Sequence, residues 1–145
     1  MSKTNTWETG LLELVFTNTT FAGVGDATGL PGAATAGSLY FSLHTADPGE
    51  TGDQTTSEIA YTSYARVAVA RPTAGWTVTG NAVATDANVD FPAGTGGSGT
   101  ATHFGIGTAS SGAGKLLYKG AISPSIVCGS GVTPRLNAGT VVTED

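Results

Sequence analysis

His44 and His103 carry the side chains of this 145-residue sequence best suited to proton transfer near neutral pH. Asp47 and Glu50 follow His44 closely, so a histidine–carboxylate pair is the first arrangement to consider. Neither histidine stands at a spacing typical of a metal site, and Cys128, the one cysteine, does not accompany them. We expect His44 to end a strand and hydrogen-bond a turn. We therefore predict no catalytic, cofactor-binding or metal-binding residue, and no enzyme activity.

Two further patterns resemble nucleotide-binding and calcium-binding motifs but lack a feature that each motif needs. Gly94–Gly99 spells G-x-G-x-x-G, which binds a dinucleotide only where a strand precedes it and a helix follows, and here a β-type segment follows. Asp47, Glu50 and Asp53 recur every third residue in a glycine-bearing loop, but not at the spacing of an EF-hand. The sequence also lacks the G-x-S-x-G pattern of a nucleophile elbow. The lack of any such constellation favours a structural role.

Charged residues are scarce, at 12% of the sequence against roughly 25% in an average protein. The net charge of −5 and the scattered lysines and arginines exclude a basic nucleic-acid-binding patch. No apolar run approaches the roughly 20 residues of a membrane helix, and no signal peptide is recognisable, so we expect synthesis in the cytoplasm and no membrane partner. Cys128 lies in an apolar run and is expected to be a buried, inert thiol. The surface must consist largely of Thr, Ser, Ala and Gly, as in proteins that pack against other proteins.

The elements that position these residues are mostly strands. Ser38–His44 and residues 65–70 alternate apolar and polar side chains, the pattern of strands with one buried face. Further short strands are predicted, separated by turn residues at roughly the 8–12-residue spacing of a sandwich or barrel: residues 76–79, 82–91, 102–107, 115–119, 121–128, 132–136 and 140–143. Long loops connect some of them, at Phe21–Gly37, Asp47–Ile59 and Pro92–Thr100.

Residues 6–17 are predicted to form the one helix, because Trp7, Leu11 and Leu14 recur at helical spacing. We predict a single domain over residues 1–145, with an N-terminal helical arm at residues 1–20 and a body at residues 37–145. The fold class is all-β, and the body is expected to be a jelly-roll sandwich of about eight strands.

Several phrases of the sequence together resemble a family of small tailed-phage virion proteins: Phe21–Pro31, Leu43–Glu50, Tyr64–Val69, Gly75–Val78, Thr102–Ala109 and Thr143–Asp145. Within it, the chain most resembles the cement, or decoration, proteins of phage capsids. That resemblance implies a jelly-roll dimer on the outer surface of the head that ties neighbouring capsomers together, with the major capsid protein as its partner. Similar sequences are often labelled tail-fibre proteins, so a tail-fibre or receptor-adhesion module is the alternative.

Two groups of contact residues follow as hypotheses. The acidic residues Asp47, Glu50, Asp53 and Glu58 are predicted to meet basic groups of the capsid. The helix face that carries Trp7, Leu11 and Leu14 is predicted to support a homodimer, because twofold pairing is the commonest way to cover an exposed surface.

Overall fold

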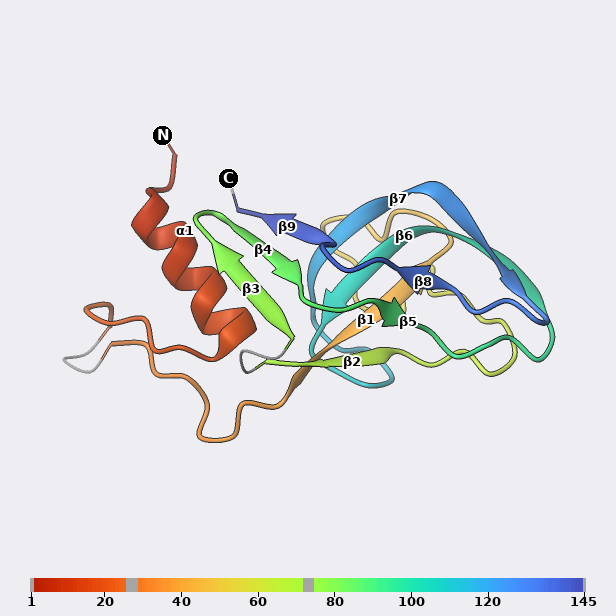
Figure 1. Ribbon diagram of the computed structural model, residues 1–145, viewed down its shortest axis with the longest axis horizontal. Coiled ribbons are helices and arrows are strands. Elements are labelled where there is room, and N and C mark those ends of the chain that lie inside the picture. Colours follow the sequence, from red (N-terminus) through yellow and green to blue (C-terminus); the bar gives the residue numbers. More distant parts are fainter. Residues whose placement is uncertain (1, 26–28, 72–74, 145) are drawn as a thin grey trace. The chain divides into compact units, whose positions relative to one another are not determined.

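The computed structural model describes residues 2–25, 29–71 and 75–144 (Figure 1). These residues are mostly β, with one short helical region at the N-terminus. The elements in chain order are helix α1 (Asn5–Leu12), its π-helical continuation η1 (Glu13–Thr17), and strands β1 (Ser38–His44), β2 (Val67–Ala70), β3 (Trp76–Thr79), β4 (Ala82–Thr85), β5 (Val89–Asp90), β6 (Ser98–Gly107), β7 (Leu116–Gly129), β8 (Arg135–Leu136) and β9 (Val141–Thr143). Among these residues, no helix has the length and hydrophobicity to span a bilayer.

The strands form three separate antiparallel sheets within the described residues. Their orders are β2-β1-β6-β7, β3-β4-β9 and β5-β8. Each of them is open, so the jelly-roll sandwich that we predict is not shown. Of the predicted all-β class with a short N-terminal helix, the structure shows a mostly β chain with that helix.

Contacts between residues divide the chain into two compact units. The first consists of Met1–Ser38, Ala70–Asn88 and Asn137–Asp145, and the second of Leu39–Val69 and Val89–Leu136. Both units are assembled from segments far apart in the sequence. The single-domain organisation, with its arm and body, stays a prediction.

In the first unit, the N-terminal helix packs against the three-stranded sheet. The ring of Phe16 meets that of Trp76 on β3 edge-on, with the centroids 4.7 Å apart. Leu12 and Phe16 are fully buried, as expected for residues four apart on one helix face. At the C-terminal end of the helix, the Arg71 guanidinium donates to the carbonyls of Leu14 and Val15, which have no further helical partners. Hydrogen bonds from a single arginine thus fix the end of the helix.

In the second unit, the four-stranded sheet has an apolar face built from cross-strand pairs. Phe41 lies opposite Ile106, and Leu43 lies opposite Phe104, and all four side chains are buried. The rings of Phe41 and Phe104 are 6.0 Å apart. On the opposite face, the segment after β1 covers the sheet and inserts the side chain of Gln54. The middle strand β1 is therefore buried on both faces, which explains why Ser42 and His44 are fully buried as well.

Three predicted boundaries are wrong. The loop predicted at Pro92–Thr100 ends earlier, because β6 begins at Ser98. Residues 82–91 do not form one strand, because the chain bends between β4 and β5 and crosses from one sheet to another. Residues 115–119 and 121–128 are not two strands but parts of the 14-residue β7. Gly120 suggests a break in the sequence, yet it pairs with Phe104, whose ring occupies the space that a side chain at this position would need. The glycine serves close packing and not a turn.

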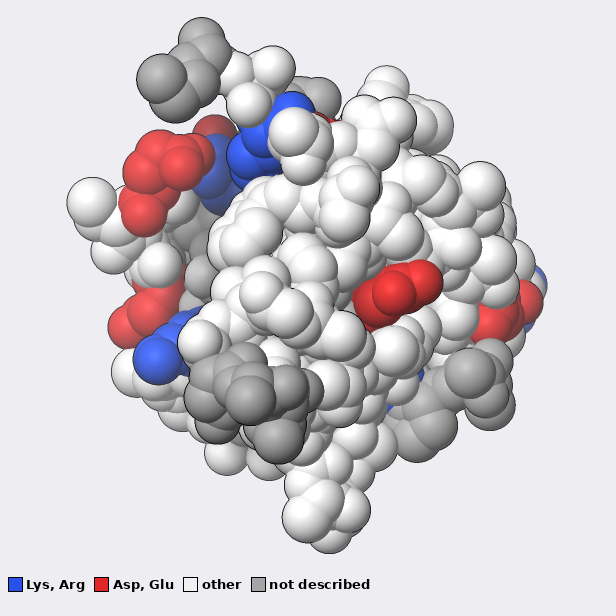
Figure 2. All heavy atoms as spheres, turned by 90° about the vertical axis from the view of Figure 1, so that its left-hand side faces the viewer, with Lys and Arg blue, Asp and Glu red and all other residues white. Residues whose placement is uncertain are grey.

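Charged side chains are sparse on the molecular surface. Figure 2 shows one face on which residues other than Lys, Arg, Asp and Glu cover most of the area. Among the described residues, the large apolar side chains that remain exposed are Trp7, Leu117, Val127 and Val141.

Candidate interaction surfaces

His44 lies at the end of β1 and is completely buried. Its Nδ1 donates to the carbonyl of Thr56, 2.8 Å away, so the Ser42 hydroxyl donates to Nε2, also at 2.8 Å. The predicted hydrogen bond between His44 and a turn is therefore confirmed. Burial lowers the pKa of His44, so the ring is neutral at pH 7. His103 lies directly opposite on β6. Through its hydrogen bond to Thr56, His44 anchors the segment that covers the sheet.

Glu58 forms an internal ion pair with Arg66, whose side chain is only 2% exposed. Nε and Nη2 of Arg66 each donate to one carboxylate oxygen at 2.7 Å, which is the bidentate geometry of a strong pair. Tyr64 donates its hydroxyl to the same carboxylate. Arg66 also donates to the carbonyls of Ala109 and Gly112 in the turn between β6 and β7. The pair thus holds three segments of the second unit together.

Asp47 and Glu50 lie beside Lys119 of β7. The Lys119 ammonium is 3.0 Å from Asp47 and 3.2 Å from Glu50. The hydrogen bonds that Lys119 donates to Asp47 and Glu50 raise its pKa, and a hydrogen bond that the backbone N–H of Gly49 donates to Asp47 lowers the pKa of Asp47. The Glu50 side chain remains 90% exposed. These partners lie about 70 residues apart in the sequence, so no local pattern could have revealed them.

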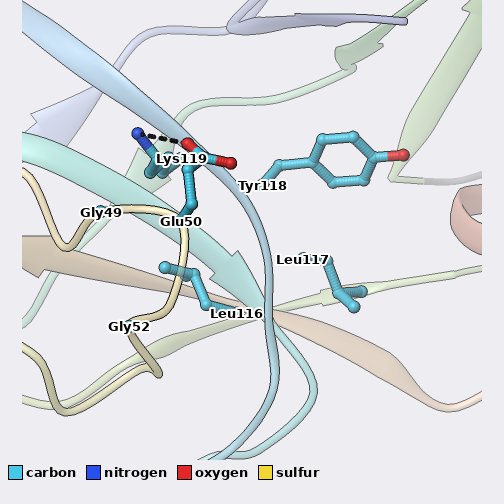
Figure 3. A pocket seen from close by; sticks show the side chains of 7 residues that line it. All are labelled: Gly49, Glu50, Gly52, Leu116, Leu117, Tyr118 and Lys119. Atoms are coloured by element: carbon cyan, nitrogen blue, oxygen red, sulfur yellow. Dashed lines mark ion pairs between the residues drawn. The ribbon is translucent and has the colours of Figure 1, made fainter.

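A hollow lies at this cluster, between the loop of Gly49–Gly52 and strand β7. It has a volume of about 310 Å³ and is lined by Gly49, Glu50, Gly52 and the four consecutive residues 116–119. Figure 3 shows Glu50 beside Lys119, with the side chains of Leu117 and Tyr118 directed away from the loop. Loop and strand residues thus meet at this hollow.

The fourth acidic residue, Asp53, shapes its own turn. Its carboxylate accepts hydrogen bonds from the backbone N–H and the hydroxyl of Thr55. These bonds lower the pKa of Asp53. Asp53 therefore stabilises the local backbone in the way that aspartate does in many turns. Of the acidic residues selected as contact residues, Glu50 presents the most exposed carboxylate, and a contact role for any of them stays a prediction.

The helix face predicted to support a dimer is only partly open. Trp7 is 40% exposed and packs against Phe21, with ring centroids 5.4 Å apart. Leu11 and Leu14 are half-buried. Phe21 can lie against the helix because Gly10 has no side chain there. The dimer contact through this face stays a prediction.

The remaining sequence motifs do not form ligand sites in the described residues. Gly94–Gly99 leads into strand β6 and not into a helix, so the requirement for phosphate binding is not met. Cys128 is buried, and burial raises the pKa of its thiol. No group of three or more His, Cys, Asp or Glu side chains converges within these ranges.

The sequence did not predict that β7 is a long edge strand with exposed apolar side chains. It is an edge strand of the four-stranded sheet, 14 residues long, and it carries two of the four exposed large apolar side chains of the described residues, Leu117 and Val127. Edge strands present unpaired backbone groups to which another chain can bind.

Comparison with known proteins identifies a family over almost the whole chain. The model of the family described as Podophage GP4 fiber I protein gp80 matches residues 2–144. No curated protein matches the chain. The family is one of structural fibre proteins, which confirms the prediction that the chain is not an enzyme.

The family match corrects the predicted role. The identification as a capsid cement protein is wrong, because the matching family is a fibre family of the virion. The predicted location on the outer surface of the head, with the major capsid protein as partner, is therefore wrong as well. The chain is a virion protein of the tail fibre, which was the alternative. The resemblance of these sequence segments correctly indicated a phage virion protein. It did not distinguish a protein of the head from a protein of the tail.

Proposed function

Because the chain belongs to the family of podophage GP4 fiber I protein gp80, we propose that it is a building module of the tail fibre that acts through protein–protein contacts. The observation that carries this proposal is the family match over residues 2–144. The module joins neighbouring fibre components, among them a second copy of itself.

The surface composition supports assembly by packing. Charged residues make up 12% of the sequence. Among the described residues, four large apolar side chains are exposed to solvent: Trp7, Leu117, Val127 and Val141. Interfaces between proteins are depleted of charge at their centres and enriched in aromatic side chains. Burial of such groups in an assembled fibre gains about 25 cal/mol per Å² of apolar surface.

The internal pairing of charges also supports a rigid module. Glu58 and Arg66 hold three segments of the second unit together, and Asp53 closes its own turn. A fibre must transmit force between the particle and the host surface, and buried, hydrogen-bonded networks resist local opening. The structure of the module and its proposed mechanical role therefore agree.

A homodimer is part of this proposal, with the helix face of Trp7, Leu11 and Leu14 as one candidate contact. Light scattering at micromolar concentration is expected to give about 29 kDa, twice the 14.4 kDa of the chain. If Trp7 lies at the centre of the contact, Trp7→Ala converts the dimer to a monomer, because aromatic residues dominate interface energies. A wild-type monomer at this concentration contradicts the homodimer.

Immunogold labelling of intact virions tests the function itself. Antibodies raised against the purified chain are expected to decorate the tail fibres and not the head. Virions assembled without the chain are expected to have shortened or missing fibres and to adsorb poorly, with heads that retain DNA normally on heating. Label on the head, or complete fibres in the depleted particles, contradicts the proposal.

A further inference from the structure

We propose that the N-terminal helix, α1 with its continuation η1, packs antiparallel against the same helix of a second copy of the chain. The twofold axis of this pair lies beside Thr9. The inference rests on the proposed self-association and specifies the surface that makes it and the orientation of the two copies.

A hollow of about 500 Å³ runs along one side of this helix. Two rows of helix residues line it, and the chain segment that follows the helix lines its other side: the rows are Asn5–Thr9–Glu13 and Thr6–Gly10–Glu13. Residues three or four apart share a helix face, so the hollow extends over about two turns. Apart from Glu13, the helix residues in it are short and uncharged. A second helix can therefore approach to the spacing of about 8–10 Å that packed helices have.

An aromatic pair borders the hollow. Phe21 lines it and packs against Trp7, with ring centroids 5.4 Å apart, and Trp7 is 40% exposed. A twofold axis perpendicular to two antiparallel helices leaves the aromatic pair of each copy on the same side of the contact, so that the four rings meet there. Aromatic side chains are enriched at interfaces because each of them buries a large area. The contact thus covers an indole ring that the single chain leaves partly in water.

The two ends of the hollow carry complementary charge. At one end the helix begins, and the Thr4 side chain does not cap it. The N–H groups of Asn5 and Thr6 have no acceptor among the described residues. At the other end lies Glu13, whose carboxylate forms no hydrogen bond or ion pair within the same part of the chain. Free N–H groups and the helix dipole make the first turn attractive to a carboxylate.

An antiparallel arrangement brings these ends together twice. Asn5 and Glu13 are eight residues apart, about 12 Å along a helix axis, with Thr9 midway between them. A twofold axis beside Thr9 therefore places Glu13 of one copy against the first turn of the other, and symmetry supplies the reverse contact. A parallel pair in register brings the two Glu13 carboxylates together instead, and like charges repel. The charge pattern thus selects the antiparallel orientation.

Disulfide cross-linking tests this orientation in a Cys128→Ser background, which removes the native thiol. In the antiparallel pair, position 6 of one copy faces position 13 of the other. A mixture of Thr6→Cys and Glu13→Cys chains is therefore expected to form a covalent dimer on mild oxidation, measured on a non-reducing gel. Each variant alone is expected to stay uncrosslinked, because its two thiols are about 9 Å or more apart along the helices, whereas a disulfide needs Cα atoms within about 7 Å.

A matched pair of charge variants tests the energetics. Glu13→Gln removes a carboxylate from both helix N-termini of the dimer and is expected to raise the dimer dissociation constant about tenfold. Glu50→Gln makes the same chemical change at a carboxylate that is 90% exposed in the second unit, and it is expected to leave the dimer unchanged. Sedimentation equilibrium measures both constants, and circular dichroism checks that both variants fold.

The outcomes separate this inference from the proposed function. A dimer that cross-links in either single variant but not in the mixture, or that responds equally to Glu13→Gln and Glu50→Gln, overturns the helix pairing and keeps the self-association through another face. A monomeric wild-type chain overturns both the pairing and the self-association. Neither result affects the labelling of tail fibres, which tests the family role alone.

Discussion

Substitution of Glu58 by Gln isolates the contribution of one buried charge. The side chain keeps nearly the same shape but loses its negative charge, while Arg66 stays 2% exposed and cannot release its proton. The guanidinium then has neutral acceptors in place of the carboxylate: the one amide oxygen of the glutamine and the carbonyls of Ala109 and Gly112, at 3.0 and 2.9 Å. The variant thus leaves a buried cation without its counterion.

The expected cost follows from this arrangement. Removal of one partner from a buried ion pair destabilises a protein by about 3–5 kcal/mol. Glu58 is 17% exposed, so water can partly solvate the gap, and we expect the lower end of the range, about 3 kcal/mol. For a chain of this size, that corresponds to a fall in melting temperature of roughly 6–12 °C.

Equilibrium unfolding in guanidinium chloride, followed by circular dichroism, measures the effect. Asp90→Asn is the matched control, because it makes the same chemical change in the solvent-exposed pair of Asp90 and Arg135 and is expected to leave the midpoint unchanged. The double variant Glu58→Gln/Arg66→Met is expected to be more stable than Glu58→Gln alone, since the stranded cation is gone. A Glu58→Gln variant within about 1 kcal/mol of wild type refutes the buried-pair argument.

Three further predictions concern stability. Burial lowers the pKa of His44, so the unfolded state binds a proton more readily than the folded state. The free energy of unfolding is therefore expected to be constant above pH 6.5 and to fall below it, by up to about 1.4 kcal/mol per pH unit. Thermal melts from pH 7.5 to 5 measure this fall, which should be much weaker in His44→Gln. Gly107→Ala places a methyl group 2.2 Å from Gln54 Cδ and 2.5 Å from the Lys115 carbonyl oxygen, so a loss of about 1–3 kcal/mol is expected in the same unfolding assay. EDTA is expected to leave the melting temperature unchanged, because no metal-binding group converges in the described ranges; a fall of many degrees contradicts this.

The sequence was sufficient to predict elements with a strong period. The strand Ser38–His44 occurs as predicted, because its apolar side chains alternate onto the buried face. The helix of residues 6–17 also occurs, but its buried face carries Leu12 and Phe16, whereas Trp7, Leu11 and Leu14, on which the prediction was based, are partly exposed. The division of the chain between sheets was not predictable in this way. β4 and β5 are separated by three residues but belong to different sheets, and only the non-local pairing of β4 with β9 and of β5 with β8 decides this.

The candidate surfaces were predictable only in part, because charge partners distant in sequence leave no local signal. Asp47 and Glu58 are equally acidic in the sequence, but Glu58 is bound to the buried Arg66, whereas Asp47 lies exposed beside Lys119. Long-range partners of this kind change an acidic residue from a contact candidate into a structural one. The opposite holds for β7, in which two unremarkable segments merge into a long edge.

The confusion of head with tail has a physical basis. A cement protein and a fibre module both bind through packed, low-charge surfaces, so scarcity of charge and lack of catalytic residues describe both. What distinguishes them is the symmetry and position of the partner, which no single strand or loop encodes. In this chain, the residues chosen to meet a basic capsid surface are largely engaged within the chain itself, and of the four Glu50 offers the most exposed carboxylate. Even that carboxylate lies 3.2 Å from the Lys119 ammonium, so an acidic residue in the sequence predicts a partner's basic surface only where the chain itself supplies no cation.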